Sequence, residues 1–168
     1  FGGKLEKDLG EQKHPAKGAV REVLEETGVS IPLSTMEESK VGTINFTFDD
    51  WQDHSAMRVH LFCVFVSLSE DATCSTPNQT QNASTVTIHP DQIRGCDEIE
   101  PCWVHDCYDL PLHQMFADDS IWLTHFLSSL DAAGERNRHG SPPKMNGWFH
   151  FAPGGDSNNK ILHYFLDA

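Results

Sequence analysis

The chain of 168 residues is predicted to be an α/β protein in which a mixed β-sheet lies between helices. Two segments carry apolar residues at every third or fourth position, which is typical of amphipathic helices. Several others are rich in β-branched and aromatic residues and alternate with polar ones, which is typical of strands. No segment repeats another, and the length suits one domain with a substantial core.

The first predicted helix begins at Pro15 and ends before Gly28. Proline fits a first helical position, and glycine fits the left-handed residue that ends a helix. An apolar stripe, which we expect to pack against a sheet, is formed by Ala16, Ala19, Val20, Val23 and Leu24. Glu22, Glu25 and Glu26 are spaced three and four residues apart, so they share another face of this helix.

These three neighbouring carboxylates repel one another unless a cation lies between them. Each like-charge pair at such spacing is unfavourable by about 0.2 to 0.5 kcal/mol. Magnesium prefers about six oxygen ligands and often binds carboxylates together with water and substrate phosphates. The pattern therefore favours a site for a metal-bound phosphate chain, and a solvated acidic face is the alternative.

Two hairpins are predicted from the strand-like segments. Residues 41–48 and 57–67 alternate and are joined by a polar connection, which indicates an antiparallel pair. Residues 147–151 and 161–166 are aromatic-rich and are joined through a turn that contains proline and glycine. Both pairs would contribute to the sheet.

The middle of the chain is predicted to add a strand at residues 98–104 and a helix at residues 121–130. Asp118, Asp119 and Ser120 precede this helix and offer oxygen atoms that can cap it. Two polar stretches, residues 68–95 and 131–144, are predicted to be surface loops inserted into the fold.

Composition excludes several classes of function. The formal net charge is −13, which disfavours a long contact with a nucleic acid polymer. No run of about 18 apolar residues occurs, so no membrane span is expected. The five cysteines are odd in number and form no CxxC pair, which indicates reduced thiols in a reducing compartment. We expect a cytoplasmic protein, with mitochondrial or nuclear pools as alternatives.

The helix and the loop before it resemble the Nudix box of the Nudix hydrolases. The matching residues are Gly3, Glu11, Arg21, Glu22, Val23, Glu25, Glu26, Gly28 and Val29. Seven residues separate the glycine from the loop glutamate and nine follow before the arginine, where the family has five and seven. The resemblance implies that Arg21 pairs with Glu11 and holds the loop over the helix. A surface ion pair without consequence is the alternative.

The resemblance also implies Mg²⁺, with Mn²⁺ as an alternative, and a set of residues that act on a diphosphate. The metal ligands would be Glu22, Glu25, Glu26, Glu98 and the backbone carbonyl of Gly2. Whether Glu26 or Glu98 is the general base stays open, and Glu98 has the alternative of an exposed acid at a strand end. Lys4 would contact phosphate, or would be a solvated lysine.

A second resemblance, to the animal MutT homologues within this family, covers nearly the whole chain. It rests on residues 41–48, 57–60, 97–103 and 115–120. The base pocket that it implies comprises Phe46, Phe48, Met57 and Phe116, with Asp118 and Asp119 at the purine edge. Core packing is the alternative for the first three residues, and helix capping is the alternative for the two aspartates. Our hypothesis is that the two aspartates share a proton and so present one donor and one acceptor.

The two resemblances together imply magnesium-dependent hydrolysis of oxidised purine nucleoside triphosphates, such as 8-oxo-dGTP and 2-hydroxy-dATP, to monophosphate and pyrophosphate. The expected partner is this small molecule, and we expect a monomer. Residues 1–168 would form one Nudix domain that lacks the amino-terminal strands of its relatives. Hydrolysis of another nucleoside diphosphate derivative, and a non-catalytic Nudix-like binding module, are the alternatives.

Overall fold

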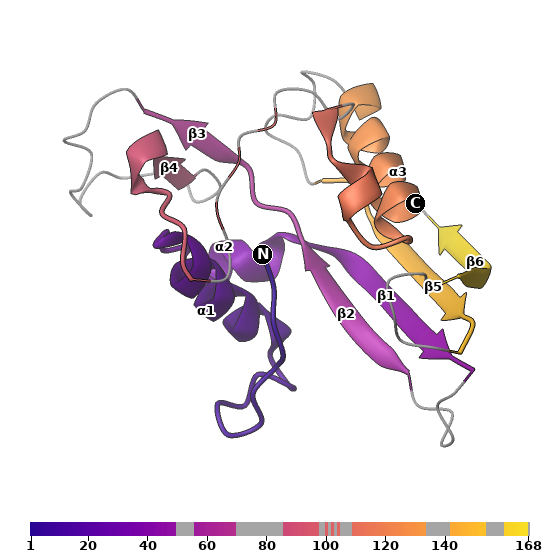
Figure 1. Cartoon of the computed structure of the whole chain (residues 1–168). Coiled ribbons are helices and arrows are strands. Elements are labelled where there is room, and N and C mark those ends of the chain that lie inside the picture. The colour runs from indigo at the N-terminus through magenta and orange to yellow at the C-terminus, as the bar shows by residue number, and fades with distance from the viewer. Residues whose placement is uncertain are drawn as a thin grey trace. The chain divides into compact units, whose positions relative to one another are not determined.

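Figure 1 shows the chain as a computed structural model. The structure describes residues 1–49, 56–69, 86–97, 100, 102, 104, 109–133, 142–153 and 160–167. The elements in chain order are α1 (Pro15–Thr27), α2 (Leu33–Glu38), β1 (Lys40–Phe48), β2 (Met57–Phe62), β3 (Val66–Leu68), β4 (Val86–Ile88), the 3₁₀ helices η1 (Pro90–Gln92) and η3 (Leu112–Gln114), α3 (Asp119–Ala133), β5 (Met145–Phe151) and β6 (Ile161–Asp167).

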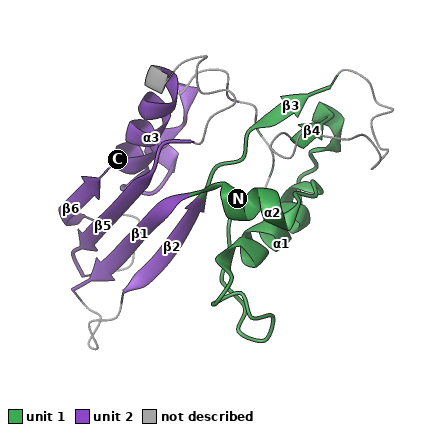
Figure 2. Ribbon diagram, turned by 180° about the vertical axis from the view of Figure 1, so that it is seen from behind, with its two compact units in different colours: residues 1–40, 62–103 green, residues 41–61, 104–168 purple. Residues whose placement is uncertain are grey.

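The chain forms two compact units that alternate along the sequence (Figure 2). Unit 1 comprises residues 1–40 and 62–103, and unit 2 comprises residues 41–61 and 104–168. Each unit has its own apolar cluster.

Helix α1 of unit 1 has the predicted boundaries. Pro15 is its first residue, and Gly28 follows it with a left-handed φ of 73°, its N–H donating to the carbonyl of Leu24. Ala16 is buried in a cluster with Val29, Ile31, Met36 and Ile88, and Ala19, Val20 and Val23 pack against that cluster. The prediction that Leu24 belongs to the apolar stripe is wrong, because its side chain is 48% exposed.

The partners of α1 in this cluster come from short elements that the sequence pattern did not indicate. Helix α2 contributes the buried Met36, and β4 contributes the buried Ile88. Residues 68–95 are therefore not a loop throughout, because β4 pairs in parallel with β3 and η1 follows it. Residues 70–85 lie outside the described part of the chain. A side chain that packs into the core, as Ile88 does, favours regular structure even within a polar stretch.

The predicted strand at residues 57–67 is divided in two. β2 ends at Phe62 and β3 begins at Val66, so the run of strand-forming residues is interrupted between them. Within the strand predicted at 98–104, residues 98, 99, 101 and 103 lie outside the described residues.

Unit 2 contains a four-stranded sheet in the order β2-β1-β5-β6. β1 and β5 are parallel, whereas β5 and β6 are antiparallel. The arrows of β1 and β2 run in opposite directions in Figure 1. The predicted α/β class, the mixed sheet and both hairpins are thus confirmed.

Helix α3 covers one face of this sheet. Its residues Ile121 and Trp122 pack against a cluster that includes Phe46 and Phe149. The helix continues to Ala133, so the first residues of the loop predicted at 131–144 are helical. Residues 134–141 lie outside the described part of the chain.

Two further expectations concern the whole chain. None of the helices in the described segments has the length and apolar character needed to cross a membrane. Cys63 and Cys96 are free thiols, and burial raises the pKa of the Cys63 thiol.

Candidate functional site

The loop before α1 closes on itself at Glu6 and Glu11. The N–H of Glu11 donates to the carbonyl of Glu6 over 3.2 Å, and the N–H of Glu6 donates to Oε2 of Glu11 over 2.8 Å. Gly10 has a left-handed φ of 71°, which lets the chain turn back just before Glu11. The loop has more residues than the corresponding loop of the Nudix box. Because the closure brings residues 6 and 11 together, the extra length is accommodated in residues 7–10, and Glu11 still faces α1.

Arg21 binds Glu11 through two hydrogen bonds, as predicted. Its Nε donates to Oε1 over 2.9 Å and its Nη2 donates to Oε2 over 3.1 Å. The carboxylate of Glu11 is only 2% exposed. The hydrogen bonds from Arg21, followed by the one from the Glu6 backbone, lower the pKa of Glu11 in spite of its burial. This ion pair fastens the loop to the helix, because the bidentate geometry fixes both groups.

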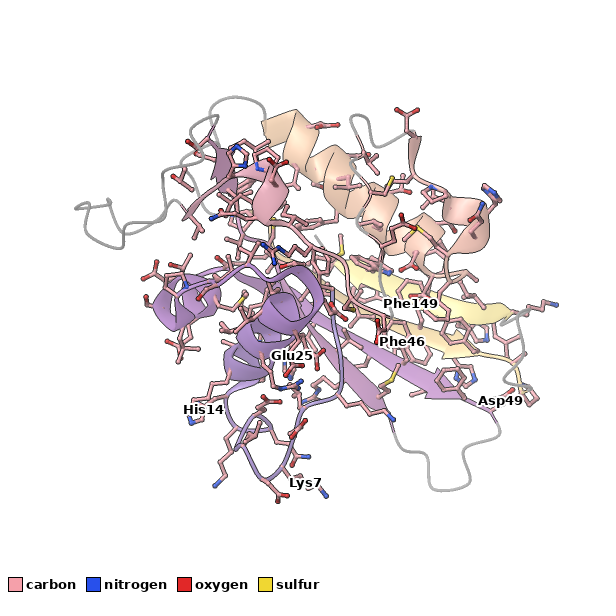
Figure 3. The ribbon with its side chains drawn as sticks, turned by 60° about the vertical axis from the view of Figure 1, so that its left-hand side comes forward. Lys7, His14, Glu25, Phe46, Asp49 and Phe149 are labelled. Carbon is pink, nitrogen blue, oxygen red and sulfur yellow. The ribbon has the colours of Figure 1, made fainter. Side chains whose placement is uncertain are left out.

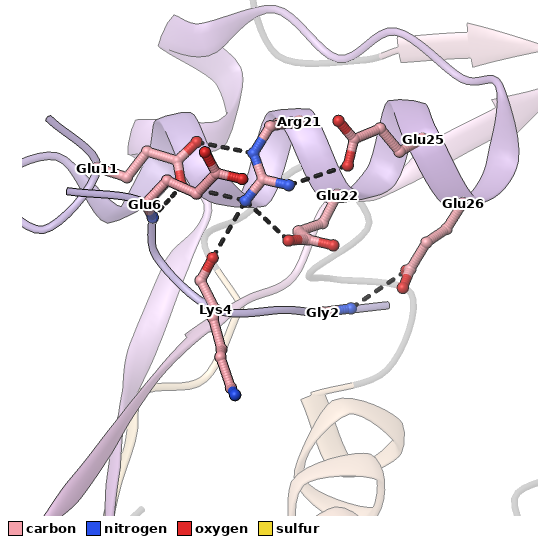
Figure 4. A network of polar contacts seen from close by, with 8 residues as sticks. All are labelled: Gly2, Lys4, Glu6, Glu11, Arg21, Glu22, Glu25 and Glu26. Carbon is pink, nitrogen blue, oxygen red and sulfur yellow. Dashed lines mark hydrogen bonds and ion pairs between the residues drawn. The ribbon is translucent and has the colours of Figure 1, made fainter. Parts of the chain in front are cut away.

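The same guanidinium also contacts two of the three predicted metal ligands (Figure 4). It lies 2.8 Å from Oε1 of Glu22 and 2.9 Å from Oε2 of Glu25, and it donates to the carbonyl of Lys4 over 3.1 Å. Its carboxylate partners, Glu11 foremost, raise the pKa of Arg21 above its usual range. Arg21 is therefore a cation that relieves the repulsion expected on this face.

Glu26 and Glu22 both lie beside the glycines at the start of the chain. The N–H of Gly2 donates to Oε2 of Glu26 over 3.2 Å. At Gly3, a Cβ atom would overlap the carboxylate of Glu22. A side chain at Gly3 would therefore require the carboxylate of Glu22 to move from its present position.

The donor chemistry of this face suits a hard cation. Glu22, Glu25 and Glu26 supply carboxylate oxygens, the ligand type that Mg²⁺ prefers. The bonds described above engage one oxygen of each carboxylate. However, no three acidic, histidine or cysteine side chains of the described residues are arranged to hold a metal ion.

Two other predicted residues of this site are placed differently. Glu98 lies outside the described residues. Lys4 is bound to Arg21 through its carbonyl, and its ammonium group points away from Arg21 in Figure 4. A contact of Lys4 with phosphate stays a prediction.

The aromatic residues predicted for a base pocket have unequal environments in unit 2. Phe46 is buried and stacks on Phe149 with a ring separation of 5.8 Å. Both residues are labelled in Figure 3. Phe48 stacks on Phe151 at 5.1 Å. Met57 is exposed, and Phe116 is 74% exposed. Phe46 therefore has a definite packing role, whereas Phe116 has a surface free to stack on a ligand.

The two aspartates at the start of α3 also have different environments. Asp118 is buried, and this burial, together with the charge of Asp119, raises its pKa. Asp119 accepts hydrogen bonds from the N–H of Phe116 over 3.1 Å and from Nε1 of Trp122 over 3.0 Å. Asp119 is therefore held as an acceptor, and Trp122 is a partner that the sequence pattern did not single out.

Comparison with known proteins leaves the family open. No protein-family model matches the chain, and no curated protein matches it.

Proposed function

We propose that this chain is a Nudix hydrolase of the MutT-homologue type, which cleaves oxidised purine nucleoside triphosphates to monophosphate and pyrophosphate. The observation that carries the proposal is the Glu11–Arg21 ion pair. It fastens the loop to α1, and the same arginine reaches Glu22 and Glu25. This linkage of loop and helix is the arrangement that the Nudix resemblance implies.

Magnesium, when bound, would neutralise charge on the phosphate chain and activate a water molecule. The ligands proposed for it are Glu22, Glu25, Glu26 and Glu98, with the carbonyl of Gly2. The N–H of Gly2 already lies against Glu26, so this backbone is close to one proposed ligand. Arg21 orients two others, since a fixed guanidinium restricts the carboxylates that it binds.

The proposed base specificity rests on the contrasting aspartates in unit 2. A raised pKa favours the protonated form of Asp118, which can donate a hydrogen bond, whereas Asp119 accepts. An oxidised purine presents donors and acceptors side by side on one edge, so such a pair suits it. Phe116 would add stacking on the base, because aromatic faces favour offset contact with flat rings.

A non-catalytic Nudix-like binding module is the second candidate. It is favoured by one observation, which is that Arg21 engages both Glu22 and Glu25. The positive charge of Arg21 already reduces the repulsion between these carboxylates, so a bound metal ion would stabilise them less. In such a module the network would stabilise the loop and perform no chemistry.

Pyrophosphate release from 8-oxo-dGTP, measured with and without Mg²⁺, separates the two candidates. We expect magnesium-dependent release by the full chain, reduced by about 10²- to 10⁴-fold in Glu25→Gln. Glu37→Gln is a matched control, because Glu37 is an exposed glutamate on α2. Release that is absent, or equal in Glu25→Gln and in the unsubstituted chain, would contradict the catalytic proposal.

A substrate panel tests the choice of nucleotide. We expect 8-oxo-dGTP and 2-hydroxy-dATP to be hydrolysed with higher kcat/KM than dGTP and dATP. Nucleoside diphosphate sugars and dinucleotide polyphosphates complete the panel. A higher kcat/KM for either of these classes would retain the Nudix chemistry and reject the proposed substrate.

A further inference from the structure

A line of polar side chains joins two strands of unit 2 on the sheet face opposite Phe46 and Phe149. Thr47 of β1 is the register partner of His150 of β5, which in turn is the partner of His163 of β6. Thr47 and His150 each follow a core phenylalanine directly, and successive strand residues point to opposite faces. These side chains therefore belong to the face away from the aromatic core.

Three short contacts connect this line. Oγ1 of Thr47 lies 2.9 Å from Nδ1 of His150, and Nε2 of the same ring lies 2.8 Å from Oδ1 of Asp49. Nε1 of Trp148 donates to Oγ1 of Thr47 over 3.1 Å. A hydroxyl, an imidazole and a carboxylate thus follow one another in hydrogen-bonded order.

The direction of these hydrogen bonds follows from the donors present. An ionised Asp49 only accepts, so Nε2 of His150 carries the proton between them. Nδ1 of the neutral ring is then an acceptor, and the hydroxyl of Thr47 donates to it. The carbonyl of Phe149 is a more distant acceptor for this hydroxyl, at 3.4 Å. His150 is therefore placed as a base toward Thr47 and is oriented by Asp49.

The imidazole is also held in place by neighbouring rings. Trp148 lies on it at a ring separation of 5.7 Å and an interplanar angle of 12°, and His163 at 6.3 Å and 10°. The backbone N–H of Asp49 donates to the carbonyl of Phe151, and this hydrogen bond anchors Asp49. Figure 3 shows Asp49 at the end of β1, and its carboxylate is 47% exposed. The line is thus ordered and open to solvent.

We propose that Thr47 is a nucleophile, with His150 as its general base and Asp49 as the residue that orients the base, and that it accepts acyl groups from activated carboxylic esters. This arrangement of nucleophile, base and orienting group is the geometric signature of covalent catalysis. The site uses none of the residues of the proposed nucleotide chemistry.

The reaction proceeds in two steps. Oγ1 of Thr47 attacks the ester carbonyl, and its proton passes to Nδ1 of His150. The tetrahedral adduct then expels the alkoxide, which takes the proton from His150 and leaves as the alcohol, and Thr47 becomes an ester. Water attacks this ester with the help of the same base, which releases the carboxylic acid and restores the hydroxyl of Thr47.

The test combines 4-nitrophenyl acetate with mass spectrometry of the full-length chain. Release of 4-nitrophenolate reports turnover, and the peptide that contains Thr47 reports the acetyl group. The variants are Thr47→Val, Thr47→Ser and His150→Phe. Thr43→Val is the matched control, because Thr43 lies four residues earlier on the same strand and the same face. Urea unfolding of every variant identifies any substitution that disrupts the fold.

We expect acetyl on the Thr47 peptide of the unsubstituted chain and of Thr43→Val. In folded His150→Phe the rate of acetylation should fall by about 10²-fold, in keeping with the loss of a general base. Thr47→Ser should retain labelling, and Thr47→Val should lose it. Equal labelling of Thr47 in His150→Phe, or equal turnover in Thr47→Val, would show that the line only ties β1 to β5 and would overturn the proposal. If His150→Phe does not fold, the turnover of Thr47→Val is the deciding measurement, and turnover equal to that of the unsubstituted chain overturns the proposal.

Discussion

The two units stabilise their proposed functional residues by different forces. In unit 1, Arg21 gathers the carboxylates of Glu11, Glu22 and Glu25 through ion pairs. In unit 2, Phe46, which is predicted to contact the base, is held by stacking on Phe149. The arrangement in unit 1 should therefore respond to pH and salt, whereas that in unit 2 should respond to changes of side-chain volume.

One carboxyl group from each unit, Glu11 in unit 1 and Asp118 in unit 2, shows the same difference between ion pairing and burial. Hydrogen bonds from Arg21 lower the pKa of Glu11, whereas burial and the nearby charge of Asp119 raise the pKa of Asp118. Both side chains are buried. The comparison teaches that the partner of a buried carboxyl, rather than its burial alone, decides its charge.

The largest effect is expected from Phe149→Ala in unit 2. This ring is completely buried and stacks on Phe46, Phe151 and Tyr164, so its removal leaves a cavity. We expect the free energy of unfolding in urea to fall by about 3 to 5 kcal/mol. Phe165→Ala is the control, because Phe165 on β6 is exposed. Equal losses in the two variants would contradict the assignment of the core.

Glu11→Gln should weaken unit 1 in a way that depends on pH. The lowered pKa means that ionised Glu11 stabilises the fold above the ordinary value of 4.5, and that this contribution is lost as pH falls through the folded pKa. We expect a lower urea midpoint at pH 7 and a smaller loss of stability on acidification than in the unsubstituted chain. Glu6→Gln, an exposed glutamate of the same loop, is the control. An unchanged acid profile in Glu11→Gln would reject the role of this pair.

Asp118→Asn should change the pH dependence of stability in the opposite direction. Because the folded pKa is raised, the stabilising contribution is complete below the ordinary value of 3.8 and declines as pH rises through the folded pKa. Asparagine cannot ionise, so the urea midpoint at pH 7 should be unchanged or higher than in the unsubstituted chain. A clear loss of stability at pH 7 would show that ionised Asp118 is favourable in the fold.

The same variant tests base recognition. If Asp118 donates to an oxidised purine, Asp118→Asn should change the ratio of kcat/KM for 8-oxo-dGTP to that for dGTP. Asp119→Asn should change this ratio as well, and it should also lower stability by about 1 kcal/mol, because Asp119 accepts bonds at the start of α3. Unaltered discrimination in both variants would refute the proposed pocket.

The smallest effect is expected from Leu24→Ala in unit 1. Leu24 is half exposed, so its free energy of unfolding should change by no more than about 0.5 kcal/mol. Val23→Ala, the neighbour that packs against the buried cluster, should lose more stability in the same urea titration. A larger loss in Leu24→Ala would restore Leu24 to the apolar stripe.

Several features of the fold could be predicted because their signals are local. Pro15 and Gly28 bound α1 through the φ angles that these residues favour. The Glu11–Arg21 pair was predicted through the Nudix resemblance, and the structure contains it. By contrast, β4 spans only three residues, so its pattern is too short to distinguish from the polar segment around it.

The sequence by itself determined the ends of α1, the alternation of the sheet strands and the sharing of one helix face by Glu22, Glu25 and Glu26, since each depends on neighbours a few residues apart. Only the tertiary structure decided that Phe46 would be buried and that Thr47 would meet a histidine 103 positions later. The physical reason is that strand pairing and burial bring distant side chains together, and no local pattern encodes which partner each one meets.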